Sequence, residues 1–508
     1  MMLEEKSSSL TNLMDYYNYT MNALNFSRRS GIEDTIKKIE EGKSVIFTAP
    51  TGYGKTTMTE VLALAAIKGN EVFDRVIHVL PLRSIVQDLY RKLIKNSEKL
   101  GIDKREIAAQ DMDFTDSPYF LKKVNITTLD TFILNLFKVP VAEIKRVIKG
   151  NGSHFEIPRA MIYSSIVIFD EFHLFSEEGR PLTSTIASLR ALNDLGVPFI
   201  IMTATLSENI KGLIKKELGI NGNLCEVNAN DFSIERKISV DFIDDEKLTI
   251  NQLVEKFPID KNKKTLIVFN TRKDAIEAYK ILKHFNPLLL HSKFNKIDRT
   301  KKIESIDDYN LVISTQVIEA GIDKSFDRLI TEAAPASSII QRAGRVARYG
   351  GYGEVIIFPF RDYVYDRDEV NETLNEIRKR GSIDQSLMSV SKEHSDLNPM
   401  LLKSLELIDD NVLFSLTSRD LIEEECNLTR EVSLVMGFPP ECYSVNCAIP
   451  LTEEEALKEL EQNKRVIKDG KEEYLDAIPR RDCISIYFLK KGIDGIVIKG
   501  YDETGGIL

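Results

Sequence analysis

The 508-residue sequence contains no tryptophan and only five cysteines, none of which forms a C-x-x-C pair. Pairs at that spacing are typical of zinc sites, and dense cysteines in a short secreted chain are typical of disulfide frameworks. Neither pattern is present, so neither a zinc site nor a disulfide framework is predicted. We therefore expect reduced packing cysteines throughout, including the neighbouring Cys442 and Cys447.

Long apolar runs and an excess of positive charge are absent as well. The first thirty residues contain no run of signal-peptide length, and no run approaches the ~18 residues of a membrane span. We therefore expect a cytoplasmic protein. The net charge is −10 at pH 7. A surface that is basic all over is thus excluded, and any nucleic acid would bind in a local channel.

What the sequence does contain is typical of a globular α/β protein with about three domains of ~150 residues. Short β-rich apolar runs alternate with helical patterns over 31–232 and again over 233–360. Such alternation predicts parallel sheets with helices on both faces, in two tandem domains. The predicted strands are 45–48, 76–80, 124–127, 166–169 and 199–202, followed by 265–269, 288–290, 311–314, 328–331 and 355–358.

The two ends of the chain have a different character. Residues 1–30 are polar with scattered aromatics, and we interpret them as a short N-terminal arm. Residues 361–508 are predicted to form an accessory C-terminal α+β domain. Its signals are a helix face at Val370, Leu374 and Ile377, a capping box at Thr452 and Glu455, and strand-like runs over 484–489 and 495–499.

The stretch 49–56, Ala-Pro-Thr-Gly-Tyr-Gly-Lys-Thr, has the pattern of a phosphate-binding loop between a buried strand and a helix. Its backbone N–H groups can point at a polyphosphate, while Lys55 adds a cation and Thr56 a hydroxyl for Mg²⁺. The alternative is a glycine-rich turn without a ligand. The residues predicted to contact the nucleotide are Thr51, Gly52, Tyr53, Gly54, Lys55, Thr56 and Thr57.

Two adjacent carboxylates follow the apolar strand at 166–169. Ligands of open α/β sheets bind at the carboxyl ends of strands. Asp170 is predicted to hold Mg²⁺ together with Thr56, and Glu171 to orient and deprotonate the water that attacks the γ-phosphate. A solvated strand end is the alternative, and the phosphate loop upstream favours the functional interpretation. His173 follows the two carboxylates by two positions, and for this reason a coupling role is predicted for it.

Two further segments carry polar groups suited to the same chemistry. Thr203 and Thr205 flank an alanine at the end of another strand, where their hydroxyls can rearrange with nucleotide state. Residues 341–348, Gln-Arg-Ala-Gly-Arg-Val-Ala-Arg, are predicted to form a helix that presents Gln341, Arg345 and Arg348 within about a turn. Guanidinium groups can neutralise developing γ-phosphate charge, so hydrolysis would require closure of the two domains.

In order and spacing, the phosphate loop, Asp-Glu-Phe-His, Thr-Ala-Thr and the arginine motif resemble those of superfamily II helicases. The likeness covers about residues 29–360. It is closest to the helicase part of the CRISPR-associated helicase-nuclease of type I interference systems. The motifs that carry this closer likeness are residues 48–56, Pro-Leu-Arg-Ser at 81–84, Thr-Thr-Leu-Asp at 127–130, residues 170–173, Leu-His-Ser-Lys-Phe at 290–294, and residues 314–323.

The resemblance implies two RecA-like domains, ATP and Mg²⁺ as cofactors, and single-stranded DNA threaded over both domains, with RNA as the alternative. Asp323 would approach the ribose, and Lys55, Glu171, Gln341, Arg345 and Arg348 would be catalytic. Hydroxyls, amides and cations suit contact with phosphates regardless of base sequence. The implied nucleic-acid contacts are Arg83, Thr128, Asn270, Thr271, Arg272, His291, Lys293, Thr315 and Gln316.

Two departures from the family pattern matter. Ile32 stands where such helicases usually carry a glutamine that reads adenine, although Arg29 and Phe26 could bracket a base. None of the six histidines precedes an aspartate, and only about 30 residues precede the motor, so the HD nuclease signature is missing. We expect a stand-alone helicase subunit that works with a separate HD nuclease and a CRISPR surveillance complex. The alternatives are a generic RNA or DNA helicase and a nucleotide-binding scaffold that recruits a nuclease without turnover.

Overall fold

The chain forms two compact units in the computed structural model, and each unit contains two stretches of sequence. Unit 1 comprises residues 1–233 and 393–431, and unit 2 comprises residues 234–392 and 432–508. None of the described helices is long and apolar enough to cross a bilayer. The structure describes residues 10–50, 52–110, 116–143, 146, 154–175, 179–204, 206–219, 223–229, 231, 235–245, 249–319, 322–361, 364–390, 396–410, 434–440, 442–478, 484–502, 504 and 506–507.

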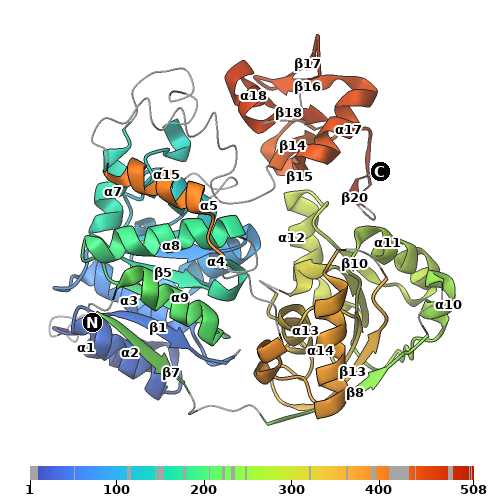
Figure 1. Ribbon diagram of the computed structural model, residues 1–508, viewed down its shortest axis with the longest axis horizontal. Coiled ribbons are helices and arrows are strands. Elements are labelled where there is room, and N and C mark those ends of the chain that lie inside the picture. Colours follow the sequence, from blue (N-terminus) through green and yellow to red (C-terminus); the bar gives the residue numbers. More distant parts are fainter. Residues whose placement is uncertain are drawn as a thin grey trace. The chain divides into compact units, whose positions relative to one another are not determined.

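Unit 1 is built on a seven-stranded, all-parallel sheet (Figure 1). The strand order β3-β4-β2-β5-β6-β1-β7 places β1 between β6 and β7. Because β1 and β5 both pair with β6 in parallel, the carboxyl ends of these three strands lie on the same side of the sheet. The strands are β1 (Ser44–Thr48), β2 (Arg75–Leu80), β3 (Ile107–Gln110), β4 (Val124–Thr128), β5 (Ser165–Asp170), β6 (Phe199–Thr203) and β7 (Leu224–Asn228).

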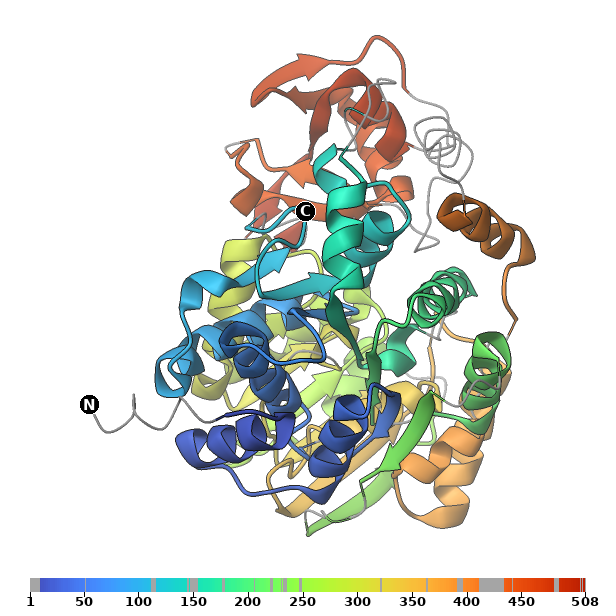
Figure 2. The same cartoon turned by 90° about the vertical axis from the view of Figure 1, so that its left-hand side faces the viewer.

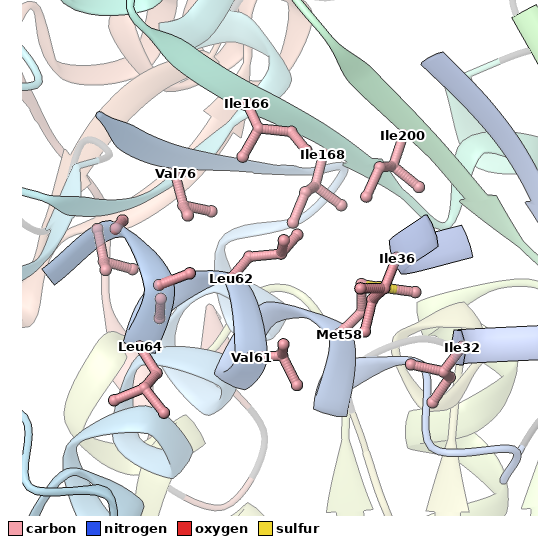
Figure 3. Packing of buried hydrophobic residues seen from close by; sticks show 14 of the residues in the cluster. Ile32, Ile36, Met58, Val61, Leu62, Leu64, Val76, Ile166, Ile168 and Ile200 are labelled. Atoms are coloured by element: carbon pink, nitrogen blue, oxygen red, sulfur yellow. The ribbon is translucent and has the colours of Figure 1, made fainter. Parts of the chain in front are cut away.

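Both faces of this sheet are buried under helices. Along β1, Val45 and Phe47 belong to one core, and Ile46 belongs to the core on the opposite face. Figure 3 shows Leu62 directed at Val76 and Ile168 of the sheet. The first face is covered by α1 (Leu13–Leu24), α2 (Ser30–Glu40), α3 (Thr56–Lys68) and α4 (Arg83–Leu100), and the second by α5 (Leu129–Leu136), α7 (Glu156–Tyr163), α8 (Gly179–Asp194) and α9 (Glu208–Leu218).

The N-terminal arm contains a packed helix, α1. Asn12 and Asp15 form a capping box at its start, and Tyr16 and Tyr17 are buried in the core. The Tyr16 hydroxyl donates to the Gly69 carbonyl at 2.7 Å, which ties α1 to the end of α3. Helices α1 and α2 lie side by side in both ribbon views (Figures 1 and 2).

Unit 2 contains a six-stranded, all-parallel sheet in the order β10-β11-β9-β12-β13-β8. Its strands alternate between two cores, as Leu266 and Ile267 of β9 show. The strands are β8 (Arg236–Phe242), β9 (Thr265–Val268), β10 (Leu288–Leu290), β11 (Leu311–Ser314), β12 (Arg328–Glu332) and β13 (Gly351–Phe358). The helices are α10 (Ile250–Glu255), α11 (Arg272–Ile281), α12 (Lys296–Glu304), α13 (Ala336–Ala343) and α14 (Arg367–Arg380).

The end of the chain forms a five-stranded mixed sheet in the order β15-β14-β18-β16-β17, with a small β19-β20 hairpin. The predicted fold class, two parallel-sheet α/β domains followed by a C-terminal α+β domain, is confirmed. Its elements are β14 (Leu434–Phe438), β15 (Ile449–Thr452), α17 (Glu453–Asn463), β16 (Arg465–Lys468), β17 (Lys471–Tyr474), α18 (Ile484–Lys491), β18 (Ile493–Val497), β19 (Tyr501–Asp502) and β20 (Gly506–Ile507).

Three sequence expectations have clear outcomes in this C-terminal domain. The capping box of Thr452 and Glu455 is confirmed at the start of α17. The strand predicted over 484–489 is wrong, because these residues belong to helix α18. The expectation of reduced cysteines is also wrong for Cys442 and Cys447, which form a disulfide. The short helical turn Val445–Cys447 brings their Cα atoms to 5.9 Å, a separation that a disulfide can span.

The region predicted as one accessory domain is divided between the two units within the described residues. Helix α14 packs on the parallel sheet of unit 2, whereas α15 (Pro399–Asp410) packs against α8 of unit 1 (Figure 1). Leu401, Leu405 and Ile408 are the buried residues of α15. The ammonium of Lys138 donates to the Asp409 carbonyl at 3.0 Å, which satisfies an acceptor at the helix end.

Candidate functional site

The predicted phosphate loop connects the end of β1 to the start of α3. Gly52 and Gly54 have φ angles of 84° and 95°, a left-handed region that favours glycine. The Thr57 N–H donates to the Gly54 carbonyl at 2.9 Å, so the helix begins directly from the loop. The Lys55 ammonium lies 3.3 Å from the Ala49 carbonyl, across the same loop. Thr51 is outside the described residues.

Tyr53 anchors this loop through its side chain. The ring is 1% exposed, and its hydroxyl donates to the Asp231 carboxylate at 2.6 Å and accepts from the Gly31 N–H at 2.9 Å. Burial and the Asp231 carboxylate raise the pKa of Tyr53 to about 12. The Arg29 guanidinium lies 5.6 Å from the ring centroid. The Tyr53 side chain therefore points into the fold, and only its backbone remains in the loop as a group for phosphate.

The two predicted carboxylates follow β5, whose Asp170 pairs in register with Met202 of β6. Glu171 has a φ of 52°, and its N–H donates to Asp170 Oδ1 at 2.8 Å. The other oxygen of Asp170 lies 3.3 Å from His78 Nε2. Burial opposes ionisation of Asp170, but the hydrogen bond with His78 and the Lys55 cation help to outweigh it and hold the pKa of Asp170 below its usual value. An ionised carboxylate at this position suits a magnesium ion.

His173 connects the acidic pair with the end of β6. Its Nδ1 lies 3.1 Å from Thr203 Oγ1 and 3.6 Å from a Glu171 carboxylate oxygen. Burial lowers the pKa of His173, against the pull of the Glu171 carboxylate, so the ring is neutral. The Thr203 carbonyl accepts from the Ala49 N–H at 3.0 Å. The structure thus brings three predicted motifs of unit 1 together at one sheet edge; Thr205 lies outside the described residues.

The arginine motif of unit 2 departs from the predicted helix over 341–348. Helix α13 ends at Ala343. Beyond it, the Arg345 carbonyl accepts from the Phe326 N–H at 2.9 Å, and the Ala347 N–H donates to the Phe326 carbonyl at 3.0 Å. These bonds replace helical ones, so Gln341 lies on α13 while Arg345 and Arg348 lie on the turn that follows.

Arg345 is 7% exposed and donates to main-chain carbonyls of its own unit. Its Nε and Nη1 lie 3.0 Å and 2.6 Å from the carbonyls of Ile318 and Ile322, and Nη2 donates to the Glu319 carbonyl. Arg348 differs, because its Nε donates to the Asp323 carboxylate at 2.7 Å and the carboxylate is largely exposed. Arg345 therefore holds the main chain that carries these carbonyls in place. Arg348 is instead paired with Asp323, the residue predicted to reach the ribose.

A second buried network lies beside this motif. Arg342 is completely buried and donates to Glu319 Oε1 at 2.7 Å and to Asn270 Oδ1 at 2.9 Å. The Asn270 amide also donates to the Ala333 carbonyl at 2.9 Å. The side chain of Asn270, predicted to contact nucleic acid, is thus engaged inside unit 2. Sequence reasoning did not assign a role to Arg342.

The other predicted nucleic-acid contacts gather at strand ends within each unit. In unit 1, Arg83 begins α4 after β2, and Thr128 ends the neighbouring strand β4 and caps α5. In unit 2, the remaining contacts follow the carboxyl ends of the adjacent strands β10, β11 and β9. They are Asn270, Thr271, Arg272, His291, Lys293, Thr315 and Gln316.

Several of these residues in unit 2 already have protein partners. Lys293 forms an ion pair with Glu455 and donates to the Pro450 carbonyl at 2.8 Å. The His291 ring stacks on Phe294 at 4.2 Å between centroids. Gln316 donates to the Asn270 carbonyl at 2.8 Å, and Thr271 caps α11. Nη1 of Arg272 is buried without a hydrogen-bond partner among the described residues.

Sequence reasoning missed His78, which touches Asp170, and Asp231, which holds Tyr53. The available signal for His78 was a single imidazole within the otherwise apolar interior of strand 75–80. Asp231 gave no signal, because it lies 178 residues from Tyr53 in sequence.

Comparisons with known proteins found two family models that match parts of the chain. A DEAD/DEAH box helicase family model matches residues 32–213, and the model described as CRISPR-associated nuclease/helicase Cas3, C-terminal, matches residues 261–351. The CRISPR-associated helicase Cas3 of Thermoproteus tenax is 24% identical over 331 residues, 62% of this chain and 55% of that protein. The CRISPR-associated nuclease/helicase Cas3 of Methanothermobacter thermautotrophicus is 28% identical over 369 residues, 65% of this chain and 42% of that protein.

The fold is also found among solved structures. A crystal structure of T. fusca Cas3 with AMPPNP is similar with a TM-score of 0.65 and 16% identity, covering 97% of this chain and 70% of that one. This chain spans about half the length of the curated relatives that it matches.

The two parallel sheets, the predicted phosphate loop and the match to the DEAD/DEAH box model support a superfamily II helicase. The match to the C-terminal Cas3 model and the similarity to the curated Cas3 relatives support the Cas3 type within that class. The predicted resemblance is thereby confirmed.

Proposed function

We propose that the chain is an ATP-hydrolysing, nucleic-acid-stimulated motor. The observation that carries this proposal is the connected set in unit 1: Lys55 in the loop, Asp170 and Glu171 after β5, and His173 bonded to Thr203 after β6. The loop amides and Lys55 bind the triphosphate. Glu171 orients the attacking water and accepts its proton.

The donor set of unit 1 fits a magnesium ion. Mg²⁺ prefers oxygen ligands and usually takes only one or two protein groups beside phosphates and water. The described residues contain no cluster of three or more His, Cys, Asp or Glu side chains suited to a metal, while the Thr56 hydroxyl and Asp170 supply oxygen ligands of the required kind. When bound, the ion neutralises charge on the phosphates. Asp170 is held ionised for this role by its hydrogen bond to His78.

We propose that the Arg348 guanidinium stabilises the negative charge of the transition state. Arg345 instead holds the main chain of its own unit in place. The support is that three carbonyls of its own unit already occupy the Arg345 guanidinium, whereas Arg348 has an exposed carboxylate partner that a phosphate can replace. Such an exchange would release Asp323 toward the ribose. Gln341 assists at the same position from α13.

The proposed substrate is single-stranded DNA within a CRISPR type I interference system, opened by a surveillance complex and cut by an HD nuclease on another chain. Support comes from the cations and hydroxyls at the strand ends of both units, from the Arg272 nitrogen that has no partner among the described residues, and from the Cas3 relatives. A phosphate backbone suits these groups.

The test is ATP hydrolysis by the purified chain with no nucleic acid, with single-stranded DNA and with single-stranded RNA. Strong stimulation by DNA supports the proposal, and stimulation by RNA alone overturns the choice of substrate. Lys55→Ala provides the matched inactive protein. Equal target degradation by the wild type and Lys55→Ala, in the presence of nuclease and surveillance complex, would instead indicate a scaffold that works without turnover.

A further inference from the structure

His78 lies at the centre of strand β2, in a place where every neighbour in the strand interior is apolar. It is completely buried, and it lies on the face of the sheet that packs against α3, as Val76 and Leu80 do. Its Nδ1 is 2.9 Å from Thr59 Oγ1, and its Nε2 is 3.3 Å from Asp170 Oδ2. One imidazole therefore joins the helix that follows the phosphate loop to the carboxylate predicted to hold the metal.

The chemistry of the groups sets the direction of the inner hydrogen bond. An ionised carboxylate can only accept, so Nε2 donates to Asp170. The Thr59 hydroxyl can both donate and accept, so it is a suitable partner for Nδ1. The second oxygen of Asp170 accepts the Glu171 N–H at 2.8 Å. Each oxygen of Asp170 thus has one hydrogen-bond donor, and the two donors together fix the orientation of the carboxylate. The lone pairs that point away from these donors can bind a metal.

We propose that His78 is a positioning residue for nucleotide-dependent metal binding, which orients Asp170 from behind and ties it to α3 through Thr59. The proposal rests on the proposed function, since it concerns the same magnesium site. A buried imidazole in an apolar strand is costly unless both nitrogens are satisfied, and here the two partners are a predicted metal ligand and the helix that starts at Thr56. Groups that orient metal ligands in this way typically change metal affinity or activity about 10- to 100-fold when removed.

Two amide substitutions separate the two hydrogen bonds. The amide introduced by His78→Gln reaches the place of Nε2, because a glutamine side chain is one methylene longer than that of asparagine, and it can still donate to Asp170. The amide introduced by His78→Asn can occupy only the place of Nδ1, so it keeps the partner Thr59 and loses Asp170. Thr59→Val removes the outer bond and leaves His78 in place.

The decisive measurement is the affinity for Mn²⁺, read by electron paramagnetic resonance in the presence of a non-hydrolysable ATP analogue. We expect His78→Asn to weaken Mn²⁺ binding about 10-fold or more. The magnesium concentration for half-maximal ATP hydrolysis should rise in parallel. His78→Gln should restore both quantities to near the wild-type values, and Thr59→Val should weaken binding less than His78→Asn does.

Asn125→Ala is the matched control, because Asn125 is an equally buried polar residue of the same sheet whose amide donates to the Lys122 carbonyl at 2.7 Å, away from Asp170. An unchanged Mn²⁺ affinity in His78→Asn would overturn the proposal. Equal weakening in Asn125→Ala would overturn it too, since the effect would then be a general loss of packing. If the wild type hydrolyses no ATP but binds Mn²⁺ with the analogue, the proposed function fails while the role of His78 is still decided by the binding data.

Discussion

In the proposed mechanism, turnover depends most directly on Lys55, the cation of the predicted phosphate loop. We expect Lys55→Ala to lower ATP hydrolysis by at least about 100-fold, because the lost charge stabilises the transferring phosphoryl group. Steady-state hydrolysis and the affinity for a fluorescent ATP analogue measure the effect. Lys68→Ala, at the far end of the same helix, is the control and should behave like the wild type. Turnover at the wild-type rate in Lys55→Ala would show that the loop is not the site of hydrolysis.

Glu332 gives unit 2 a pH-dependent stability. The side chain is completely buried at the end of β12, where it accepts the backbone N–H groups of Asn270 and Arg361 at 2.8 Å and 2.9 Å. Burial outweighs these donors and raises the pKa of Glu332 to about 7. The folded protein therefore holds this proton more tightly than the unfolded chain, and the resulting stability is lost as the pH rises from about 4.5 to about 7.

Glu332→Gln tests this dependence, because glutamine has no proton to lose. The amide of the variant has one acceptor fewer than the carboxyl group at every pH. This loss lowers the free energy of unfolding of the variant by an amount that does not depend on pH. We expect the free energy of unfolding of the wild type to fall relative to the variant, by roughly 3 kcal/mol between pH 4.5 and 7 at 1.36 kcal/mol per pKa unit. Denaturation midpoints measured across this range provide the comparison. Glu372→Gln on the exposed face of α14 is the control; parallel curves for Glu332→Gln and the wild type would contradict the prediction.

At the scale of single residues, the sequence indicated which side chains carry suitable hydrogen-bonding groups. It did not indicate which partners those groups bind. Asn270 and Arg345 have the donors expected of ligand-binding groups, yet both are satisfied by partners within unit 2. Those partners come from other strands and turns, so only the tertiary fold selects them. Asp170 was easier to find, because the carboxyl end of a buried parallel strand is a fixed place in any sheet of this kind.

Among the elements, α15 makes the most testable contribution. Leu405 is completely buried in the unit 1 core, although it lies more than 170 residues beyond residue 233, the end of the first stretch of that unit. We expect Leu405→Ala to destabilise unit 1 by about 2–5 kcal/mol, because the substitution leaves a cavity beneath the helix. Hydrogen exchange should show lost protection in both α15 and α8.

Leu407→Ala provides the control on the same helix, since Leu407 is 55% exposed. This variant should keep wild-type protection and thermal stability. If both variants lose protection equally, the helix is held by its intrinsic stability and not by the packing of Leu405.

The elements also show where propensity misleads. Strands β1, β2 and β5 were predictable, because apolar runs between turn signals leave few alternatives in an α/β chain. Residues 484–489 were predicted as a strand, whereas the structure has helix α18 there. In the structure Ile484 and Phe488, four positions apart, both enter the C-terminal core, and this helical spacing decides the conformation.

For the whole molecule, the central proposal is that an arginine of unit 2 acts on the nucleotide bound by unit 1. We expect Arg348→Ala to retain nucleotide affinity within about twofold and to lose about 1,000-fold of the DNA-stimulated hydrolysis, as loss of a transition-state arginine does elsewhere. Nucleotide binding and stimulated turnover are measured side by side. Lys379→Ala, an exposed cation of α14, is the control. Normal stimulated turnover in Arg348→Ala would contradict the two-unit mechanism.

The return of the chain to unit 1 through α15 also bears on how the protein is made. A ribosome releases residues in order at about 5–20 per second, so α15 follows the end of the first stretch of unit 1 by roughly 10–35 s. During that interval the nascent unit 1 lacks Leu401, Leu405 and Ile408, which complete its second core. We therefore expect the apolar surface against which α15 packs to be exposed to solvent and to chaperones until α15 itself, which follows the parallel sheet of unit 2, has been synthesised.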